Sequence, residues 1–183
     1  MTSCAILAWG SLIWKHPAGN YIMKDTNIEL PIQFSRISDN KKGRCTLVID
    51  YENGILNKCK ALISTDKECE PMRIFNCLKK REKTINKHIH FINFETNENH
   101  HNLKIKEVIQ IKNWCSENDI KFICWTGLPS NIEKFSYEFI FNYINEQEKT
   151  NFKLYCLTLD YILRCLFICK ISNPELLKFI NPT

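Results

Sequence analysis

The chain has 183 residues, 44% of them hydrophobic, a size and composition typical of one domain with a full core. Its 25 basic and 20 acidic residues give a formal net charge of +5 that is scattered along the chain, which argues against a nucleic-acid partner. Ten cysteines without a Cys-x-x-Cys pair, and an N-terminus without the charged start of a signal peptide, predict a reducing cytoplasm, no disulfide and no metal site.

Six segments rich in β-branched or aromatic residues and bounded by polar turns predict strands. In chain order they are residues 4–9, 28–37, 45–50, 58–64, 88–94 and 120–125. Strands cluster early in the chain and helices come later, which favours an α+β fold with a mostly antiparallel or mixed sheet over a regular βαβ array.

Apolar residues at helical spacing predict helices over residues 71–82, 105–117 and 133 to about 147. In the first of these, Met72, Phe75 and Leu78 recur at that spacing, and Glu70-Pro71 supplies an acidic residue and a proline suited to a first turn. Glu82 then lies at the end of this helix.

The tail, residues 151–183, holds two apolar segments, 152–171 and 174–180. We interpret it as a helical C-terminal extension of a single domain over residues 1–183. Two roles stay open for it: a helix that packs on the core, or an oligomer contact through residues 152–180. Charged residues interrupt the longest apolar stretch, 154–171, so it predicts neither a membrane-spanning helix nor a membrane partner.

An apolar strand runs into a Gly-Ser turn close to the N-terminus. Because Gly10 has no Cβ, the backbone can bend tightly there, and the N–H groups of residues 10 to 12 can converge on one anion, such as a carboxylate. The alternative is an ordinary tight turn, which many unrelated proteins contain.

A second feature is Glu82, which ends the predicted helix just before the strand-like segment 88–94. A carboxylate at this place could act as a general base. Glu82 stands between Arg81 and Lys83, so the alternative is a solvated residue at a helix end, paired with either neighbour.

Together, the Gly-Ser turn and the helix-end Glu resemble the γ-glutamylcyclotransferase superfamily. In that superfamily the N-terminal strand ends in a Tyr-Gly-Ser-Asn-like loop, to which Trp9-Gly10-Ser11-Leu12 is similar, with Leu12 in place of the polar residue. Its acid/base carboxylate lies in a helix-to-strand segment that resembles Arg81-Glu82-Lys83-Thr84.

Three further stretches resemble a bacterial subgroup of the same superfamily and occur in the same order. They are residues 30–38, 43–48 and 125–129. The resemblance therefore covers roughly residues 4 to 145 and is stronger as a set than motif by motif.

The resemblance implies a small, closed or nearly closed β-barrel with flanking helices. It also implies a reaction without a cofactor, in which the α-amine of a small γ-glutamyl substrate attacks its own γ-carbonyl and releases 5-oxoproline and a free amine. Glu82 is then the catalytic residue, and Trp9, Gly10, Ser11 and Leu12 bind the substrate.

Four residues are second-rank candidates for substrate binding. Arg36 and Arg44 could neutralise substrate carboxylates, since arginine suits bidentate carboxylate contacts, or form salt bridges at the rim of the barrel. Trp125 and Thr126 end a strand near where a pocket would open in this fold, although a strand-end Trp is more often a core residue.

Two other functions stay open: a non-catalytic binding protein for a small acidic ligand on the same scaffold, and a protein-interaction module that uses the apolar tail. Four histidines, His88, His90, His100 and His101, allow a zinc site to be imagined, but their spacing is poor and we predict no metal.

Overall fold

The computed structural model describes residues 3–66 and 69–180. The chain divides into two compact units: the first contains residues 1–30 and 58–128, and the second contains residues 31–57 and 129–183. The single domain expected over residues 1–183 stays a prediction.

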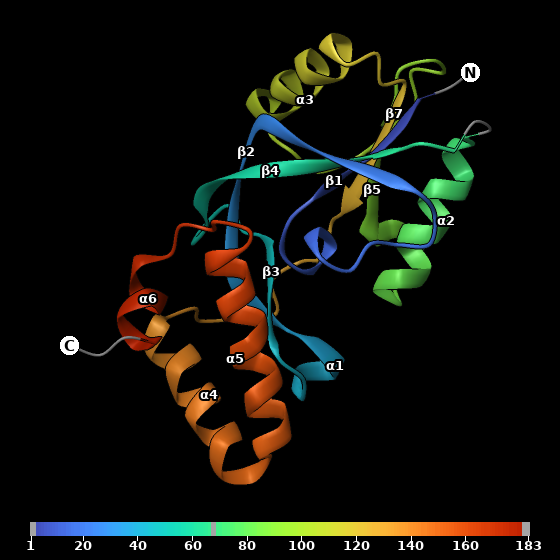
Figure 1. Ribbon diagram of the computed structural model, residues 1–183. Helices are drawn as coiled ribbons and strands as arrows, with labels where there is room; N and C mark the ends of the chain where they lie inside the picture. The colour runs from blue at the N-terminus through green and yellow to red at the C-terminus, as the bar shows by residue number, and fades with distance from the viewer. Residues whose placement is uncertain (1–2, 67–68, 181–183) are drawn as a thin grey trace. The chain divides into compact units, whose positions relative to one another are not determined.

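Within the described residues, seven strands form one mixed sheet (Figure 1). They are β1 (Cys4–Ala8), β2 (Tyr21–Ile37), β3 (Cys45–Ile49), β4 (Ile55–Ser64), β5 (Ile89–Asn93), β6 (Asn99–His100) and β7 (Phe122–Thr126). They are hydrogen-bonded in the order β3-β2-β4-β1-β7-β5-β6, in which β1 runs parallel to β7 and antiparallel to β4. The predicted α+β class and mixed sheet are confirmed. The order ends at β3 and β6, so the sheet is not closed and the expected barrel is not confirmed.

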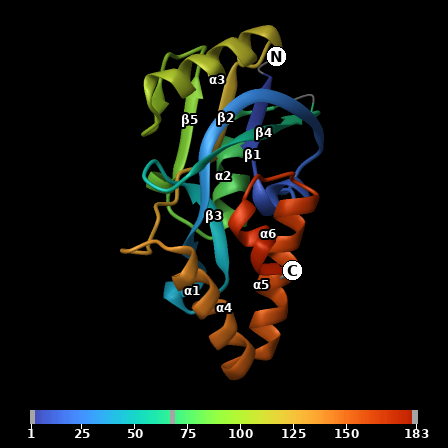
Figure 2. The same cartoon turned by 90° about the vertical axis from the view of Figure 1, so that its left-hand side faces the viewer.

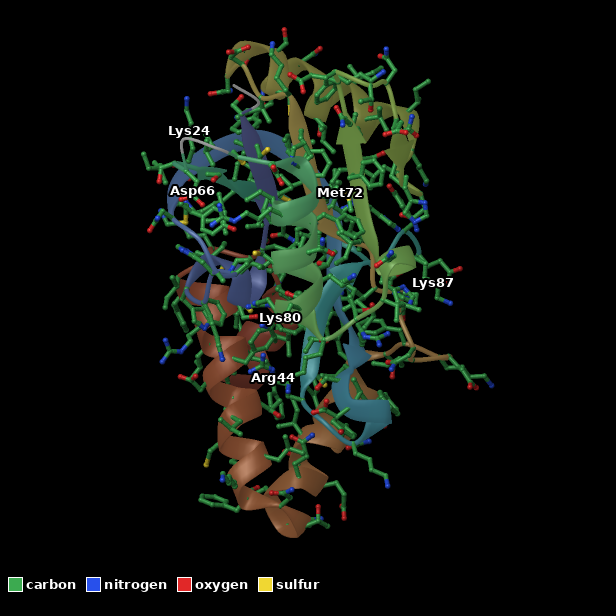
Figure 3. All side chains as sticks on the ribbon, turned by 90° about the vertical axis from the view of Figure 1, so that its right-hand side faces the viewer. Lys24, Arg44, Asp66, Met72, Lys80 and Lys87 are labelled. Atoms are coloured by element: carbon green, nitrogen blue, oxygen red, sulfur yellow. The ribbon has the colours of Figure 1, made fainter. Side chains whose placement is uncertain are left out.

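The core of the first unit is built on β1 and β7, whose residues are all buried. Such continuous apolar runs are typical of strands that are covered on both faces. Helix α2 (Pro71–Glu82) lies against β1, β5 and β7 and buries Ile74, Phe75 and Leu78. Met72 and Lys80, labelled in Figure 3, lie on its exposed side.

Helix α2 has the predicted bounds, because both of its ends carry strong local signals. Pro71 stands in the first turn, where its missing N–H costs nothing. At the other end Lys83 adopts the left-handed conformation with φ of 49°, and the Thr84 N–H donates to the Lys79 carbonyl at 3.2 Å. Glu82 is thereby held in the last turn.

Helix α3 (Ile105–Glu117) also has the predicted bounds and buries Ile111, Trp114 and Cys115. It is tied to β2 by Gln110, whose Oε1 accepts a hydrogen bond from the Glu29 N–H at 3.0 Å. Two short 3-10 helices, η1 (Gly10–Ile13) and η2 (Asn86–His88), were not expected as helices.

Among its described residues, the second unit contains β3, the C-terminal part of β2, the start of β4 and four helices. These are α1 (Ser38–Lys41), α4 (Tyr137–Thr150), α5 (Phe152–Phe167) and α6 (Pro174–Ile180). Helices α4 and α5 pack side by side (Figures 1 and 2). The rings of Phe141 in α4 and Phe179 in α6 stack with centroids 4.2 Å apart.

The tail therefore forms helices, and α5 packs on the core of the second unit. Tyr161 of α5 is buried: its Oη accepts from the Leu47 N–H at 3.3 Å, and the Arg44 guanidinium lies 4.3 Å from its ring centre. An oligomer contact through residues 152–180 stays a prediction. Within the described residues, no helix is long and apolar enough to cross a membrane.

Several boundaries differ from the prediction, by most at the starts of β2 and α4; β4 also begins at Ile55 rather than 58, and β7 begins at Phe122 rather than 120. Strand β2 begins at Tyr21 rather than 28; residues 22–25 are all exposed, so the apolar Ile22 and Met23 do not alternate with polar residues and gave no strand signal. Helix α4 begins at Tyr137 rather than 133, because the Ser136 side chain caps it by accepting from the Phe139 N–H at 3.0 Å.

Candidate functional site

The Gly-Ser turn has the tight geometry that its sequence predicts. Gly10 has a φ of +55°, a left-handed conformation that glycine adopts without a steric penalty. The Leu12 N–H donates to the Trp9 carbonyl at 3.3 Å, so this member of the predicted anion cradle is engaged within the turn. The side chains of Trp9 and Leu12 are buried, and Ser11 alone among the four loop residues has a partly exposed side chain to offer a ligand.

Arg81 joins this turn to Glu82. Its Nη2 donates to Ser11 Oγ at 2.8 Å, and its Nε and Nη2 donate to the Lys15 carbonyl at 3.2 and 3.1 Å. Its Nη1 forms an ion pair with Glu82 Oε1. The predicted base and the predicted carboxylate-binding turn, about seventy positions apart in the chain, thus contact the same guanidinium.

The Arg81–Glu82 pair is largely shielded from water, since each side chain is 15% exposed. Removing one partner of such a pair leaves the other charge poorly solvated, which costs about 3–5 kcal/mol when burial is complete and less at this exposure. The alternative interpretation of Glu82 was a solvated residue paired with a neighbour. Glu82 is paired with its neighbour Arg81, but its side chain is not solvated.

The position of Glu82 runs against the usual electrostatics of a helix. The C-terminal end of a helix carries a partial negative charge that favours Lys or Arg and disfavours Glu by about 0.3–1 kcal/mol. The positive charge of Arg81, in contact with the Glu82 carboxylate, offsets this unfavourable interaction with the helix end. Arg81 is not among the predicted site residues. The signal for it in the sequence is the acidic Glu82 at the end of a basic last turn, Lys79-Lys80-Arg81, since a carboxylate there requires a partner.

Arg36 and Arg44 belong to the second unit, whereas the turn and Glu82 belong to the first. Arg36 donates to the Pro129 carbonyl at 2.8 Å, and burial lowers the pKa of its guanidinium. Arg44 lies over the Tyr161 ring. Both arginines make structural contacts within their own unit.

Trp125 and Thr126 are buried residues of β7. The Trp125 ring meets the edge of His90 with centroids 6.1 Å apart and lies 6.2 Å from His101. Gly127 follows, and a Cβ built on it would lie 2.1 Å from the His90 ring. These contacts make Trp125 part of an aromatic core.

Histidines gather around Trp125. The ring of His90 meets that of His100 with centroids 5.2 Å apart, and burial, followed by the charges of His100, His101 and His88, lowers the pKa of His90 to about 4. The buried nitrogens His90 Nδ1, His101 Nδ1 and Trp125 Nε1 have no hydrogen-bond partner among the described residues. Across residues 3–66 and 69–180, no group of three or more His, Cys, Asp or Glu side chains is arranged to hold a metal ion.

A hollow of about 240 Å³ lies in the second unit. It is lined by Lys42, Tyr143, Glu146, Gln147, Thr150, Asn151 and Leu154. None of these residues is a predicted site residue, so the hollow adds nothing to the candidate site around Arg81.

No protein-family model matches the chain, and neither curated proteins nor solved structures give a significant match.

Proposed function

We propose that the protein is a γ-glutamylcyclotransferase-like enzyme that cleaves a γ-glutamyl amide, with Glu82 as acid and base. The observation that carries the proposal is the Arg81 bridge, because it brings Glu82 and Ser11 to one place. These are two of the features on which the resemblance to that superfamily rests. The proposal includes an α+β scaffold like that of the superfamily but not its closed barrel, since the sheet is open.

The proposed reaction needs one proton carrier. The substrate's α-amine is an ammonium at neutral pH, so Glu82 first removes a proton from it. The amine nitrogen then attacks the γ-carbonyl carbon and forms the ring bond, and it loses its second proton as it becomes the ring amide. Glu82 passes the two protons in turn to the leaving nitrogen, the bond to that nitrogen breaks, and Glu82 is ionised again at the end. The products are 5-oxoproline and a free amine, and no other reactant is consumed.

Because the attack is intramolecular, much of the catalysis consists of holding the glutamyl chain folded; well-oriented intramolecular reactions reach effective molarities of about 10⁵–10⁸ M. Ser11 suits this task. Its oxygen accepts from Arg81, which leaves the hydroxyl proton to donate to a substrate carboxylate.

A second candidate function is a binding protein for a small acidic ligand without turnover. The Arg81–Glu82 ion pair favours it, because a carboxylate that is already paired must exchange its partner before it can take a proton. Leu12 favours it too, since it stands where the superfamily has a polar residue.

Mass spectrometry for 5-oxoproline tests the proposal, after incubation with γ-glutamyl amino acids, γ-glutamyl amines and glutathione. We expect release by the wild type and loss of release in Glu82→Gln. Glu117→Gln is the matched control, because Glu117 is the exposed last residue of α3 as Glu82 is the last residue of α2. Silence of the wild type across the series, with ligand-induced thermal stabilisation, would support the binding protein instead.

A further inference from the structure

We propose that a second copy of this chain docks on the outward face of helix α5, with the two helices antiparallel about a two-fold axis. The outward face is defined by Leu157, Asp160, Arg164 and Phe167, which all lie in the second unit. The inference narrows the oligomer contact predicted within residues 152–180 to one face of one helix. It goes beyond the proposed function and does not depend on it.

Helix α5 has a buried face and an outward face. The buried face carries Thr158, Tyr161, Ile162, Cys165 and Leu166. On the outward face, Leu157 is 49% exposed and Phe167 is 60% exposed. The steps from position 157 to 160, 164 and 167 are three, four and three residues, which is the spacing of a seam along which two helices pack. Helix α5 therefore has the pattern of a helix that packs on both sides, and the described residues cover one of them.

The middle of the outward face carries two opposite charges. The Arg164 Nε donates to both carboxylate oxygens of Asp160 at 2.9 Å. The pair stands open to solvent, since the side chains of Arg164 and Asp160 are 43% and 58% exposed. An exposed pair of this kind adds little stability to a single chain. It does, however, give the apolar seam a fixed pattern of charge that a partner must match.

A second copy matches this pattern. In an antiparallel pair of α5 helices centred at the level of Ile162, position 160 of one copy lies beside position 164 of the other, and position 157 lies beside position 167. Each carboxylate then meets a guanidinium, and each Leu157 meets a Phe167. A guanidinium has five N–H donors, so Arg164 can bind the carboxylates of both copies. The outward face is thus complementary to itself in charge and in apolar character, as a two-fold contact requires.

The charges also select the orientation and the number of copies. A parallel pair would bring Asp160 against Asp160 and Arg164 against Arg164, and contacts between like charges are unfavourable. Polar residues at single seam positions are known to fix the register and the oligomeric state of packed helices. Because a two-fold contact uses the same face of both copies, assembly stops at a dimer.

Sedimentation equilibrium of the full chain tests the inference. The seam spans about 15 Å of helix at 1.5 Å per residue, and interfaces of small area bind weakly, so the protein is examined from about 5 to 500 μM. We expect a reversible equilibrium between monomer and dimer. A wild type that stays monomeric over this range, or that forms larger assemblies, would overturn the inference.

Charge reversal assigns the contact to the two central residues. Asp160→Arg and Arg164→Asp should each lower the association constant about 10-fold or more, because like charges then meet twice in every dimer. The double variant restores the pattern and should associate within about 3-fold of the wild type. An equal mixture of the two single variants should also associate. Undiminished association of either single variant, or no recovery in the double variant and the mixture, would contradict the inference.

Controls on helix α4 carry the same changes of charge. Glu148→Arg and Lys149→Asp alter exposed residues of α4 and should dimerise like the wild type. Phe167→Glu should lower the association constant roughly 30-fold or more, as expected for the loss of an aromatic anchor. Phe139→Glu, at an α4 position that is 41% exposed, should leave it unchanged. Equal losses in the two Phe variants would show that the contact is not made by α5.

Circular dichroism and thermal unfolding establish that each variant is folded. If Phe167→Glu does not fold, the charge reversals decide alone, since both positions are open to solvent. Recovery of the dimer in the double variant then carries the inference, because misfolding of the single variants would not be reversed by a second substitution of opposite charge.

Discussion

At the scale of single residues, the candidate site depends on Arg81 more than on any residue that the sequence singled out. Glu82 and Ser11 are ordinary side chains at a helix end and in a turn, and each has a plain structural explanation alone. Arg81 contacts both, together with the Lys15 carbonyl. The local sequence could identify Glu82 but not this bridge, because nothing in residues 78–84 indicates a contact with Ser11.

Ser11→Ala should destabilise the protein by about 1–2 kcal/mol, because it removes the oxygen that accepts from a charged guanidinium. Urea unfolding measures the change. Ser116→Ala, at an exposed position of α3, should stay within about 0.5 kcal/mol of the wild type. A loss no larger in Ser11→Ala than in Ser116→Ala would show that the Arg81–Ser11 hydrogen bond is not formed in solution.

Gly127→Ala should destabilise the protein by about 1–3 kcal/mol, because the added Cβ overlaps the buried His90 ring. Thermal unfolding checks this. In a His90→Ala background the obstructing ring is gone, so the same change at position 127 should cost much less. An equal cost in both backgrounds would contradict this packing.

At the scale of elements, the first unit contains a helix, α2, whose two ends carry local sequence signals, and a cluster of histidines on β5 and β6. The bounds of α2 and α3 could be predicted from Pro71 and from apolar spacing, since both signals are local. The start of β2 could not be predicted, because exposed strand residues leave no alternating pattern. At Gly10–Ile13 the Gly-Ser pair predicted a tight turn but not its 3-10 form.

The histidines on β5 and β6 predict a loss of stability in acid. The pKa of His90 is lowered to about 4, chiefly by burial. In the unfolded chain its pKa is about 6.5, so the unfolded state binds the proton first, and stability is lost as the pH falls from about 6.5 towards 4. The contribution is on the order of 2–3 kcal/mol.

Unfolding in urea between pH 4 and pH 8 checks this expectation. His90→Gln should flatten the dependence of stability on pH in that window, whatever its effect on absolute stability. His16→Gln, which changes an exposed histidine, should keep the wild-type slope. An unchanged slope in His90→Gln would contradict the buried, neutral state of this imidazole.

In the second unit, Tyr161 of α5 joins the helix to β3. Tyr161→Phe keeps the ring between Phe34 and Arg44 but leaves the buried Leu47 N–H without the Oη that accepts it, which should cost about 1–3 kcal/mol. Tyr155→Phe on the same helix, where the side chain is partly exposed, should be nearly neutral in the same unfolding experiment. Similar losses in the two variants would show that the Tyr161 hydroxyl makes no such contact.

At the scale of the whole molecule, Ser11, Arg81 and Glu82 belong to one compact unit, which the order of residues along the chain did not reveal. The α+β class and the mixed sheet could be predicted from strand and helix patterns. Whether the sheet is closed could not be predicted in this way, because closure depends on hydrogen bonds between the two end strands, β3 and β6. Arg36 and Arg44 are candidates by their chemistry alone, and they lie in the second unit, whereas Ser11 and Glu82 lie in the first.

The most direct test of the account is the rate of 5-oxoproline formation from one γ-glutamyl amine, measured for the wild type, Glu82→Gln and Glu117→Gln. The account predicts a fall of about 100-fold or more in Glu82→Gln, typical of the loss of a general acid and base, and the wild-type rate in Glu117→Gln. A wild-type rate in Glu82→Gln, or no product from the wild type, would contradict it.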